Sequence, residues 1–395
     1  MSQDRPASIA AHFAHLTDPR IARTREHRLL DILTIAICAV VCGAEGPTGM
    51  EEFGHAKEAW LRQYLELPNG IPSHDTFGRV LARLDPEELH QGFVSWFAAI
   101  RDATNGEVVA LDGKTLRGSA DRAWGTAAVQ VLTAWASSNR LVLGQQKVDP
   151  RSNEITAVPA LLDKLALAGC IVTLDALHCQ VETAKAIRRR QADYVLTVKG
   201  NQGDLHQAIH AAFAKAHGQA FANLEHDHDE TMEEGHSRWE RRTYWTLTDP
   251  TVLRRVDPKG RWPDLRCMGM VRAERRVQGQ ISVEDRLFIR STDGSAQTFG
   301  KAVRGHWGVE NSVHWVLDVV WREDDSRMLV GKGPENLAVL RRIALNIVRQ
   351  DHHSKKSLKM RRFRASLDTD YLLQLLVSAF AIPDGPNYLE PSCLP

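Results

Sequence analysis

The stretch Val-Val-Ala-Leu-Asp-Gly-Lys at residues 108–114 decides how the middle of this chain folds. A strand-like apolar run leads directly into Asp112, and the same arrangement recurs at residues 171–176, where Ile-Val-Thr-Leu leads into Asp175. Short runs of this kind that end at a turn-forming residue are typical of buried strands. We therefore expect Asp112 and Asp175 to lie at the ends of two strands.

The order of the elements around these two strands predicts the topology of a sheet. Strand patterns cover residues 107–111, 128–135, 140–148, 170–174 and 194–198, and helical patterns cover residues 158–168 and 181–191. Three closely connected strands followed by alternating helix and strand predict an α/β fold, a mixed sheet with flanking helices. This is the ribonuclease-H-like order, in which the first and fourth strands are neighbours. Asp112 and Asp175 would then be adjacent.

The pattern along the whole chain indicates five segments. They are a helical N-terminal domain at 1–104, the first part of the ribonuclease-H-like core at 105–205, a β-rich insertion at 206–298, a helical completion of the core at 299–350, and a basic, then apolar tail at 351–395. In the first segment, Ser73 is placed to cap a helix that carries Arg79, as in helix-turn-helix readers of DNA. An N-terminal packing domain fits the same spacing equally well. In the insertion, the acidic, His-rich stretch 223–235 is interpreted as an exposed loop.

Composition gives no general sign of nucleic-acid binding. The formal net charge of the 395 residues is only +1, so basic charge can act only where it gathers locally. It is densest in the tail, at Lys355, Lys356, Arg361 and Arg362, where few acidic residues oppose it. Six scattered cysteines, the lack of a signal peptide and an apolar run at 32–42 that is shorter than a membrane span favour a cytoplasmic, nucleoid-associated protein with no membrane segment.

Glu310 lies within a helical pattern from residue 299 to about 317 and could join the two Asp residues. Three converging carboxylates would form a hard oxygen site suited to Mg²⁺, the ion that commonly serves phosphoryl transfer. Two such ions about 3.5–4 Å apart can activate a nucleophile and stabilise the leaving oxygen, and Asp112 is the natural bridging ligand. Taken singly, each residue has an ordinary explanation, because an Asp after a strand is often a turn former and a helical Glu is usually solvated.

Lysine and histidine side chains accompany these carboxylates. Lys114 and Lys199 follow strands at the same expected edge, where they could meet a phosphate backbone or be ordinary surface residues. His306, Glu310 and His314 are four residues apart and share one helical face, so a zinc site is conceivable, although further His or Cys partners are missing. Contact of both histidines with the scissile phosphate region, or packing beside it, is the interpretation we favour.

These segments resemble the DDE-class transposases of bacterial insertion sequences, specifically the H-repeat-associated family. The matching motifs are Ala-Leu-Asp-Gly-Lys-Thr-Leu-Arg-Gly-Ser from residue 110, Thr-Leu-Asp-Ala-Leu-His-Cys-Gln from 173, Tyr-Val-Leu-Thr-Val-Lys-Gly-Asn-Gln from 194 and Arg-Gly-His-Trp-Gly-Val-Glu-Asn from 304. The resemblance covers nearly the whole chain. It departs from transposases that form DNA hairpins, because Val303, His306 and Leu317 stand where those carry Tyr, Arg and Lys, with Arg304 as the nearest basic substitute.

The resemblance implies a Mg²⁺-dependent enzyme, with Mn²⁺ as an alternative ion, in which Asp112, Asp175 and Glu310 form the catalytic and metal-binding triad. It would cleave double-stranded DNA at terminal inverted repeats and join the 3′-OH ends to target DNA, as a homodimer on paired ends. The candidate DNA contacts are Lys114, Lys199, Arg304, His306, His314, Lys355, Lys356, Arg361 and Arg362. Two alternatives remain open: a Mg²⁺-dependent nuclease that does not join strands, and an inactive relic that binds DNA and represses.

Overall fold

The computed structural model describes residues 9–100, 106–121, 125, 127–151, 154–235 and 238–378. The chain divides into two compact units. A helical unit comprises Met1–Ala103, Leu116–Ala128 and Leu317–Pro395, and a sheet unit comprises Thr104–Thr115 and Val129–Val316. By their contacts, the helices beyond residue 317 group with the N-terminal helices, and the completion of the core by residues 299–350 stays a prediction.

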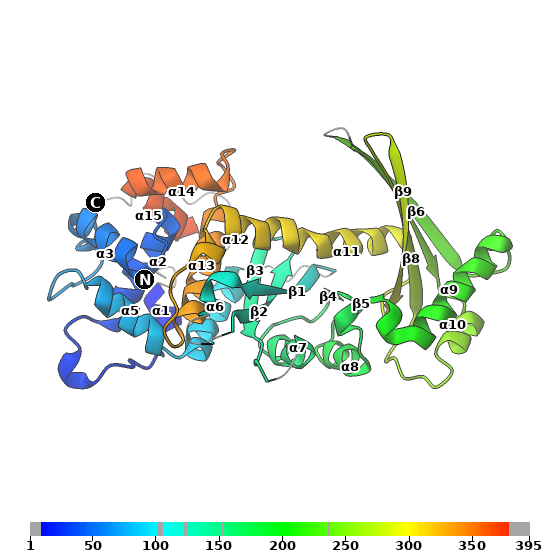
Figure 1. Cartoon of the computed structure of the whole chain (residues 1–395), viewed down its shortest axis with the longest axis horizontal. Helices are drawn as coiled ribbons and strands as arrows, with labels where there is room; N and C mark the ends of the chain where they lie inside the picture. Colours follow the sequence, from blue (N-terminus) through cyan, green and yellow to red (C-terminus); the bar gives the residue numbers. More distant parts are fainter. Residues whose placement is uncertain are drawn as a thin grey trace, which may run out of the picture. The chain divides into compact units, whose positions relative to one another are not determined.

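The helical unit is organised around one buried helix. Its helices are α1 (Ile9–Phe13), α2 (Leu29–Cys42), α3 (Pro47–Ala56), α4 (Glu58–Leu61), α5 (His74–Arg83), α6 (Pro86–Ile100), α13 (Gly333–Arg349), α14 (Leu358–Leu367) and α15 (Thr369–Ser378), with short 3₁₀ turns at Ala22–Thr24, Arg117–Ser119 and Glu323–Asp325. Helix α13 is buried on nearly every side and packs against α2, α5 and α6 (Figure 1). A helix that is covered all round needs neighbours on every face, which explains why the N-terminal helices gather around it.

Local signals in this unit act as the sequence predicts. Helix α2 is buried and ends at Gly43, whose φ of 119° is the left-handed cap that glycine supplies at low cost. The Ser73 side chain accepts a hydrogen bond from the Thr76 amide and so caps α5. The tail forms α14 and α15 as far as residue 378, and the end of its apolar run and its Pro-rich stretch lie outside the described residues. Within those residues, no single helix could cross a membrane, and α2 and α3 reach that length and hydropathy only as a pair bent by 94°.

The described residues of the sheet unit form one nine-stranded sheet in the order β3-β2-β1-β4-β5-β9-β8-β7-β6. The strands are β1 (Val108–Leu116), β2 (Val129–Ala136), β3 (Leu141–Lys147), β4 (Ile171–Leu174), β5 (Asp193–Val198), β6 (His226–Gly235), β7 (Arg238–Leu247), β8 (Cys267–Val277) and β9 (Gln280–Arg290). Strand β1 pairs with β4 in parallel, and β4 pairs in the same way with β5. The expected neighbourhood of the first and fourth strands, and with it the ribonuclease-H-like order, is confirmed.

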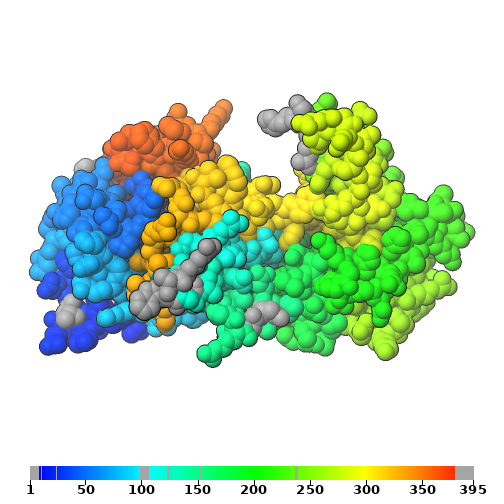
Figure 2. Space-filling model, in the orientation of Figure 1, coloured from blue at the N-terminus to red at the C-terminus, as the bar shows by residue number. Residues whose placement is uncertain are grey.

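The β-rich block extends this sheet instead of forming a body of its own. Strand β9 pairs antiparallel with β5, and β8, β7 and β6 follow as successive antiparallel neighbours. We call strands β6 to β9 the β-arm. Its far end projects past the helices that cover its base (Figures 1 and 2). Those helices are α9 (Gly203–Gly218) and α10 (Pro250–Val256).

The expected loop at residues 223–235 is wrong, because most of it is the edge strand β6. Its acidic side chains made it look like a loop, but they are matched by basic residues on β7. Glu230 pairs with Arg241 at 2.7 Å, and Glu233 pairs with Arg242 at 3.1 Å. Opposite charges across a strand pair stabilise it, and charge on an edge strand also discourages pairing with another chain.

Two layers of helix cover the central strands. Helix α7 (Glu154–Asp163) packs on β2 and β3, and α8 (Val181–Arg189) packs on β5. Helix α11 (Ala296–Val309) contacts β4, β5, β6 and β7 on the other side of the sheet (Figure 1). Phe299 and Val303 of α11 share a buried cluster with residues of the sheet that include Val108 and Ile171. This packing lays the helix that leads to Glu310 along the strands that carry the two Asp residues.

Candidate active site

Asp112 faces α11 because of strand alternation. Side chains along a strand point alternately to its two faces, so Val108, Ala110 and Asp112 share one face. Val108 lies in the cluster under α11, which places Asp112 on that side as well. Strand β1 continues to Leu116, so Asp112 lies within the strand and not at its end, two residues beyond the last β1–β4 pair, Ala110 with Thr173. The turn-forming tendency of Asp-Gly is overridden here by the surrounding sheet.

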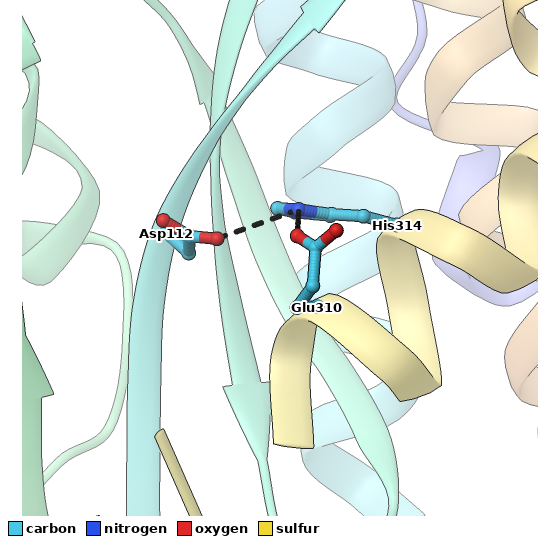
Figure 3. A group of neighbouring side chains, drawn as sticks. All are labelled: Asp112, Glu310 and His314. Atoms are coloured by element: carbon cyan, nitrogen blue, oxygen red, sulfur yellow. Dashed lines mark hydrogen bonds and ion pairs between the residues drawn. The ribbon is translucent and has the colours of Figure 1, made fainter. Parts of the chain in front are cut away.

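Glu310 and His314 come from an irregular helical turn. Helix α11 ends at Val309, a π-helical turn covers Glu310–His314, and α12 (Trp315–Val319) continues from it. Such a turn contains one residue more than an α-helical turn and is frequent at functional sites. Both side chains point toward Asp112 (Figure 3), and the buried His314 Nδ1 lies 3.4 Å from Asp112 Oδ2 and 3.3 Å from Glu310 Oε2.

Asp175 opens the loop that follows β4. The loop forms a 3₁₀ turn at Ala176–His178, and two amides from the loop after β5 hold it. Asn201 Nδ2 donates to the Ala176 carbonyl at 2.6 Å, and Gln202 Nε2 donates to the Cys179 carbonyl at 2.9 Å. The Lys-Gly-Asn-Gln motif that the sequence singled out thus fixes the segment that carries Asp175.

A fourth carboxylate, Glu154, joins the site and was not predicted from the sequence. Its Oε2 lies 3.5 Å from Nε2 of the buried His178, and the same nitrogen is 3.8 Å from Asp175 Oδ1. His178 lowers the pKa of Glu154 by hydrogen bonding to it. His178 follows Asp175 by three residues in a recognised motif, which is a usable signal. Nothing in the local sequence marks Glu154, which comes near only because α7 packs on the sheet.

Burial and the neighbouring carboxylates raise the proton affinity of Asp112. Burial is the main cause that raises the pKa of Asp112 to about 7, and the nearby charges of Asp175, Glu310 and Glu154 add to it. A carboxyl group with this pKa readily exchanges its proton for a cation at neutral pH. Asp112, Glu310 and His314 bring one ligand atom each within 4.8 Å of one another. The oxygen atoms of this group fit a hard divalent ion, and His314 adds a nitrogen that such an ion rarely selects.

His306 occupies a different place from His314, contrary to the shared helical face on which the zinc alternative depended. His306 Nδ1 lies 3.1 Å from the Thr173 hydroxyl, next to Asp175. Burial lowers its pKa to about 4, so the ring is neutral at physiological pH. The metal-ligand group found among the described residues consists of Asp112, Glu310 and His314 and does not include His306. The zinc interpretation is therefore wrong for this face.

The expected DNA contacts are placed unevenly. Lys199 is exposed and lines a cavity of about 170 Å³ with Asp175, Arg286 and Trp307, whereas Lys114 is only 8% exposed. Arg304 forms an ion pair with Glu233 of β6. The expectation of an open cationic side chain is therefore not met at Lys114.

The basic tail is split between surface and interior. Lys355 and Lys356 are exposed. Arg361 donates to the carbonyls of Val348 and Asp351, at 3.2 and 2.8 Å. Arg362 is buried over the ring of Trp321 at 4.3 Å, which corrects its expected role as a surface contact for DNA.

Comparison with known proteins places the chain in a family. The model described as "Transposase DDE domain" matches residues 104–347, and the model described as "DDE_Tnp_1-associated" matches residues 10–97. The chain belongs to the DDE transposase family. It is 37% identical to the H repeat-associated putative transposase YhhI of Escherichia coli strain K12, over 94% of this chain and 98% of that protein. It is 36% identical to the putative transposase YncI of Escherichia coli O157:H7, over 94% and 95%.

Among solved structures, the piggyBac transposase synaptic complex with hairpin DNA aligns with a TM-score of 0.39 at 11% identity, over 96% of this chain and 79% of that chain. This likeness is too weak to support an argument. Membership of the DDE family instead rests on the sequence match, and it assigns the acidic site to a family of metal-dependent phosphoryl transferases.

Proposed function

We propose that this DDE-family protein is a transposase that cuts double-stranded DNA at the terminal inverted repeats of an insertion sequence and joins the freed 3′-OH ends to target DNA. The observation that carries the proposal is the convergence of Asp112 and Glu310 from β1 and the π turn, with Asp175 close enough to raise the pKa of Asp112. These residues are the catalytic triad of the proposal.

Asp112, Asp175 and Glu310 offer the oxygen ligands that Mg²⁺ prefers, and two such ions, or Mn²⁺ in their place, would supply Lewis acids to both oxygens at the reacting phosphorus. The protein's own part is to bring these carboxylates together and hold them in place. His314 contacts both Asp112 and Glu310 and so restrains their rotamers. His178 and Glu154 do the same beside Asp175.

Charged groups around Asp175 suit a DNA backbone. Lys199 and Arg286 line the cavity next to it, as does His306, whose ring is neutral at physiological pH. A cationic wall beside an anionic metal site can hold the phosphates that flank the scissile bond. We include Lys199 among the DNA contacts on this ground, with Arg304, His306 and His314 as weaker candidates because each is already hydrogen-bonded or ion-paired.

The proposal is tested with purified protein and duplex DNA that carries the element ends, with and without Mg²⁺ or Mn²⁺. We expect cuts at the repeat ends and strand-transfer products, both dependent on the metal. Asp112→Ala should abolish cutting and retain DNA binding. Cutting without joined products would indicate the nuclease alternative, and binding without cutting would indicate the relic. Unchanged cutting by Asp112→Ala would refute the site.

We also propose that the protein acts as a homodimer on paired ends, since two ends must be held together for concerted joining. Light scattering of the complex with end-bearing DNA gives its mass and hence the number of chains bound. A complex that contains one chain per two ends would contradict the proposal.

A further inference from the structure

The helical unit contains a large groove to which neither the catalytic site nor the family match gives a role. Its volume is about 810 Å³. Three segments line it: the loop and first turn at 43–49, helix α5, and the loop at 325–330. All three belong to the helical unit, so the groove is defined within one compact body.

Three arginines stand in this groove without a partner. Arg79 and Arg83 lie one turn apart on α5 and are exposed, and Arg327 lies in the loop that lines the opposite side. Within the described residues, no hydrogen bond or ion pair links any of the three guanidinium groups to another residue. An Arg that is kept out of ion pairs on a folded surface is available for a ligand, and its planar fork matches phosphate oxygens.

Two of the three acidic residues of the groove pair with an arginine, and the third lies beside a histidine ring. Glu45 and Asp325 both bind Arg322, at 3.1 and 3.0 Å, and Asp75 lies 3.7 Å from the His74 ring. Among the residues that the structure describes, no ion pair joins these carboxylates to Arg79, Arg83 or Arg327. The groove therefore presents three arginines whose guanidinium groups are not engaged by its own acidic residues.

The floor of the groove admits a backbone. Six of its lining residues are glycine or alanine, which keeps the lining low: Gly43, Ala44, Gly46, Gly49, Gly78 and Ala82. Gly78 lies inside α5, where glycine costs roughly 1 kcal/mol of helix stability relative to Ala. A Cβ at Gly78 would meet nothing closer than the Pro47 ring at 3.8 Å, so packing does not require glycine there. Helix α3 also begins among these lining residues, and no side chain caps it. Its first-turn amides are therefore available to an anion.

We infer that this groove binds the sugar-phosphate backbone of DNA, with Arg79, Arg83 and Arg327 each meeting a phosphate. The inference rests on the proposed function, because it takes DNA as the ligand of the helical unit. It goes beyond that function by naming a contact in the helical unit, whereas the triad belongs to the sheet unit, and by assigning it to backbone, and not to base, recognition. Contacts of this kind set register and affinity without reading sequence.

The test compares two triple variants of the full chain in DNA binding without divalent metal, so that cutting plays no part. In the groove variant, Arg79, Arg83 and Arg327 become Gln. In the control, the exposed residues Arg189, Lys215 and Arg261 of the sheet unit become Gln, which removes the same charge. Each phosphate contact contributes about 0.9 to the slope of log affinity against log salt, so three contacts give a loss of roughly 2.7. We expect this loss, and at least about a tenfold weaker affinity, in the groove variant alone.

A neutral variant separates the groove from charge effects. Gly78→Gln would fill the floor without altering charge, while Gly78→Ala adds only a methyl group. We expect weaker DNA binding for Gly78→Gln, near-normal binding for Gly78→Ala, and melting temperatures at least equal to that of the wild type for both. Duplexes with end sequence and with scrambled sequence should lose affinity equally.

Several outcomes would overturn the inference. Equal losses in the two triple variants would show a general charge effect. Unchanged binding by the groove variant, in a protein whose wild type cuts element ends, would reject the groove and leave the proposed function standing. A wild-type protein that binds DNA but does not cut would reject only the proposed function, since the slopes still report on the groove. No DNA binding at all would reject both.

Discussion

Gly113 lies so close to Glu154 that a Cβ built on it would be 2.6 Å from Oε1 and 2.8 Å from Oε2 of that carboxylate. A side chain at the residue after Asp112 would therefore push the Glu154 carboxylate away from its place on the strand. His178 holds Glu154 from the other side. The position of Glu154, near the catalytic Asp112, thus depends on the lack of a side chain at Gly113.

Gly113→Ala should displace Glu154 and disturb the site without unfolding the protein. We expect cleavage of end-bearing DNA to fall by roughly 10- to 100-fold, the usual cost of removing support from metal-binding residues. Gly200→Ala is a matched control, because nothing lies within 4 Å of a Cβ at Gly200, in the loop just after Lys199. Equal activity of the two variants would show that the Glu154 contact has no role in the reaction.

Asp112→Asn should stabilise the metal-free protein at high pH while abolishing cutting. The pKa of Asp112 is raised from 3.8 to about 7, so the folded state holds this proton more tightly than the unfolded state. Stability therefore falls as pH rises from about 4 to 7, and the full cost is present above pH 7. Asn removes that cost, by roughly 2 kcal/mol for a partly solvated site.

The measurement is the difference in melting temperature between Asp112→Asn and wild type from pH 4 to 8, in the presence of a chelator. The difference should be near zero at pH 4 and largest above pH 7. Taking a difference is necessary because His306, with a pKa lowered to about 4, makes stability rise with pH between about 4 and 6.5 and partly masks the effect. A difference that shrinks as pH rises would contradict the assigned shift.

Metal ions should stabilise the protein in a pH-dependent way. A divalent ion must displace the proton of Asp112, so its binding strengthens as pH rises toward 7 and beyond. We expect Mg²⁺ at about 10 mM to raise the melting temperature more at pH 8 than at pH 5.5. A concentration on this order saturates weak carboxylate sites. Asp112→Asn should lose most of this increment. An equal increment in the variant would place the ion elsewhere.

Periodicity and element order were sufficient to predict the central sheet. The two short apolar runs predict buried strands. The order of strands and helices along the chain then restricts these strands to few topologies. Pairing of β1 with β4 and the approach of Asp112 to Asp175 followed from that alone. The family resemblance then selected Glu310 from the many helical glutamates, which no pattern of spacing could do.

What the sequence did not reveal depends on packing between distant segments. Glu154 and Gly113 meet because α7 covers the sheet. Strand β6 was mistaken for a loop because its acidic residues are stabilised by Arg241 and Arg242 on the next strand. Charge in a sequence indicates exposure, but only the partner strand decides whether an exposed segment is extended.

Trp307 should be needed to hold α11 on the β-arm. Its ring has the guanidinium groups of Arg286, Arg242 and Arg275 at 4.3, 5.4 and 5.8 Å from its centre. Cation–π contacts contribute roughly 0.5–2 kcal/mol each, depending on solvation. We expect Trp307→Leu to lower the free energy of unfolding by about 2 kcal/mol and to reduce cutting, since Glu310 follows on the same helix. Urea unfolding measures the change in stability. Trp307→Phe keeps a ring with weaker cation–π contacts, so its free energy of unfolding should lie between those of the wild type and Trp307→Leu. Wild-type stability in Trp307→Leu would contradict this role.

The basic tail should separate into a structural and a DNA-binding part. Arg362 Nη2 donates to the Val40 carbonyl at 3.0 Å and Nε to the Val41 carbonyl at 3.3 Å, which satisfies the end of α2. Removing a buried charged donor leaves these carbonyls unsatisfied, so Arg362→Gln should destabilise the protein by roughly 2–4 kcal/mol. Lys355 and Lys356 are exposed, and replacing both by Gln should leave stability within about 0.5 kcal/mol.

In DNA binding, the lysine double variant should be affected and Arg362→Gln should not. The Lys355 and Lys356 double variant should lower the salt slope by up to about 1.8, at 0.9 per phosphate contact, equally for end-bearing and scrambled duplexes. Arg362→Gln, measured at a temperature where it remains folded, should bind DNA like the wild type, because its guanidinium does not reach the surface. A slope that falls in Arg362→Gln and stays constant in the lysine variant would mean that the tail rearranges on DNA and exposes the residue that is buried here.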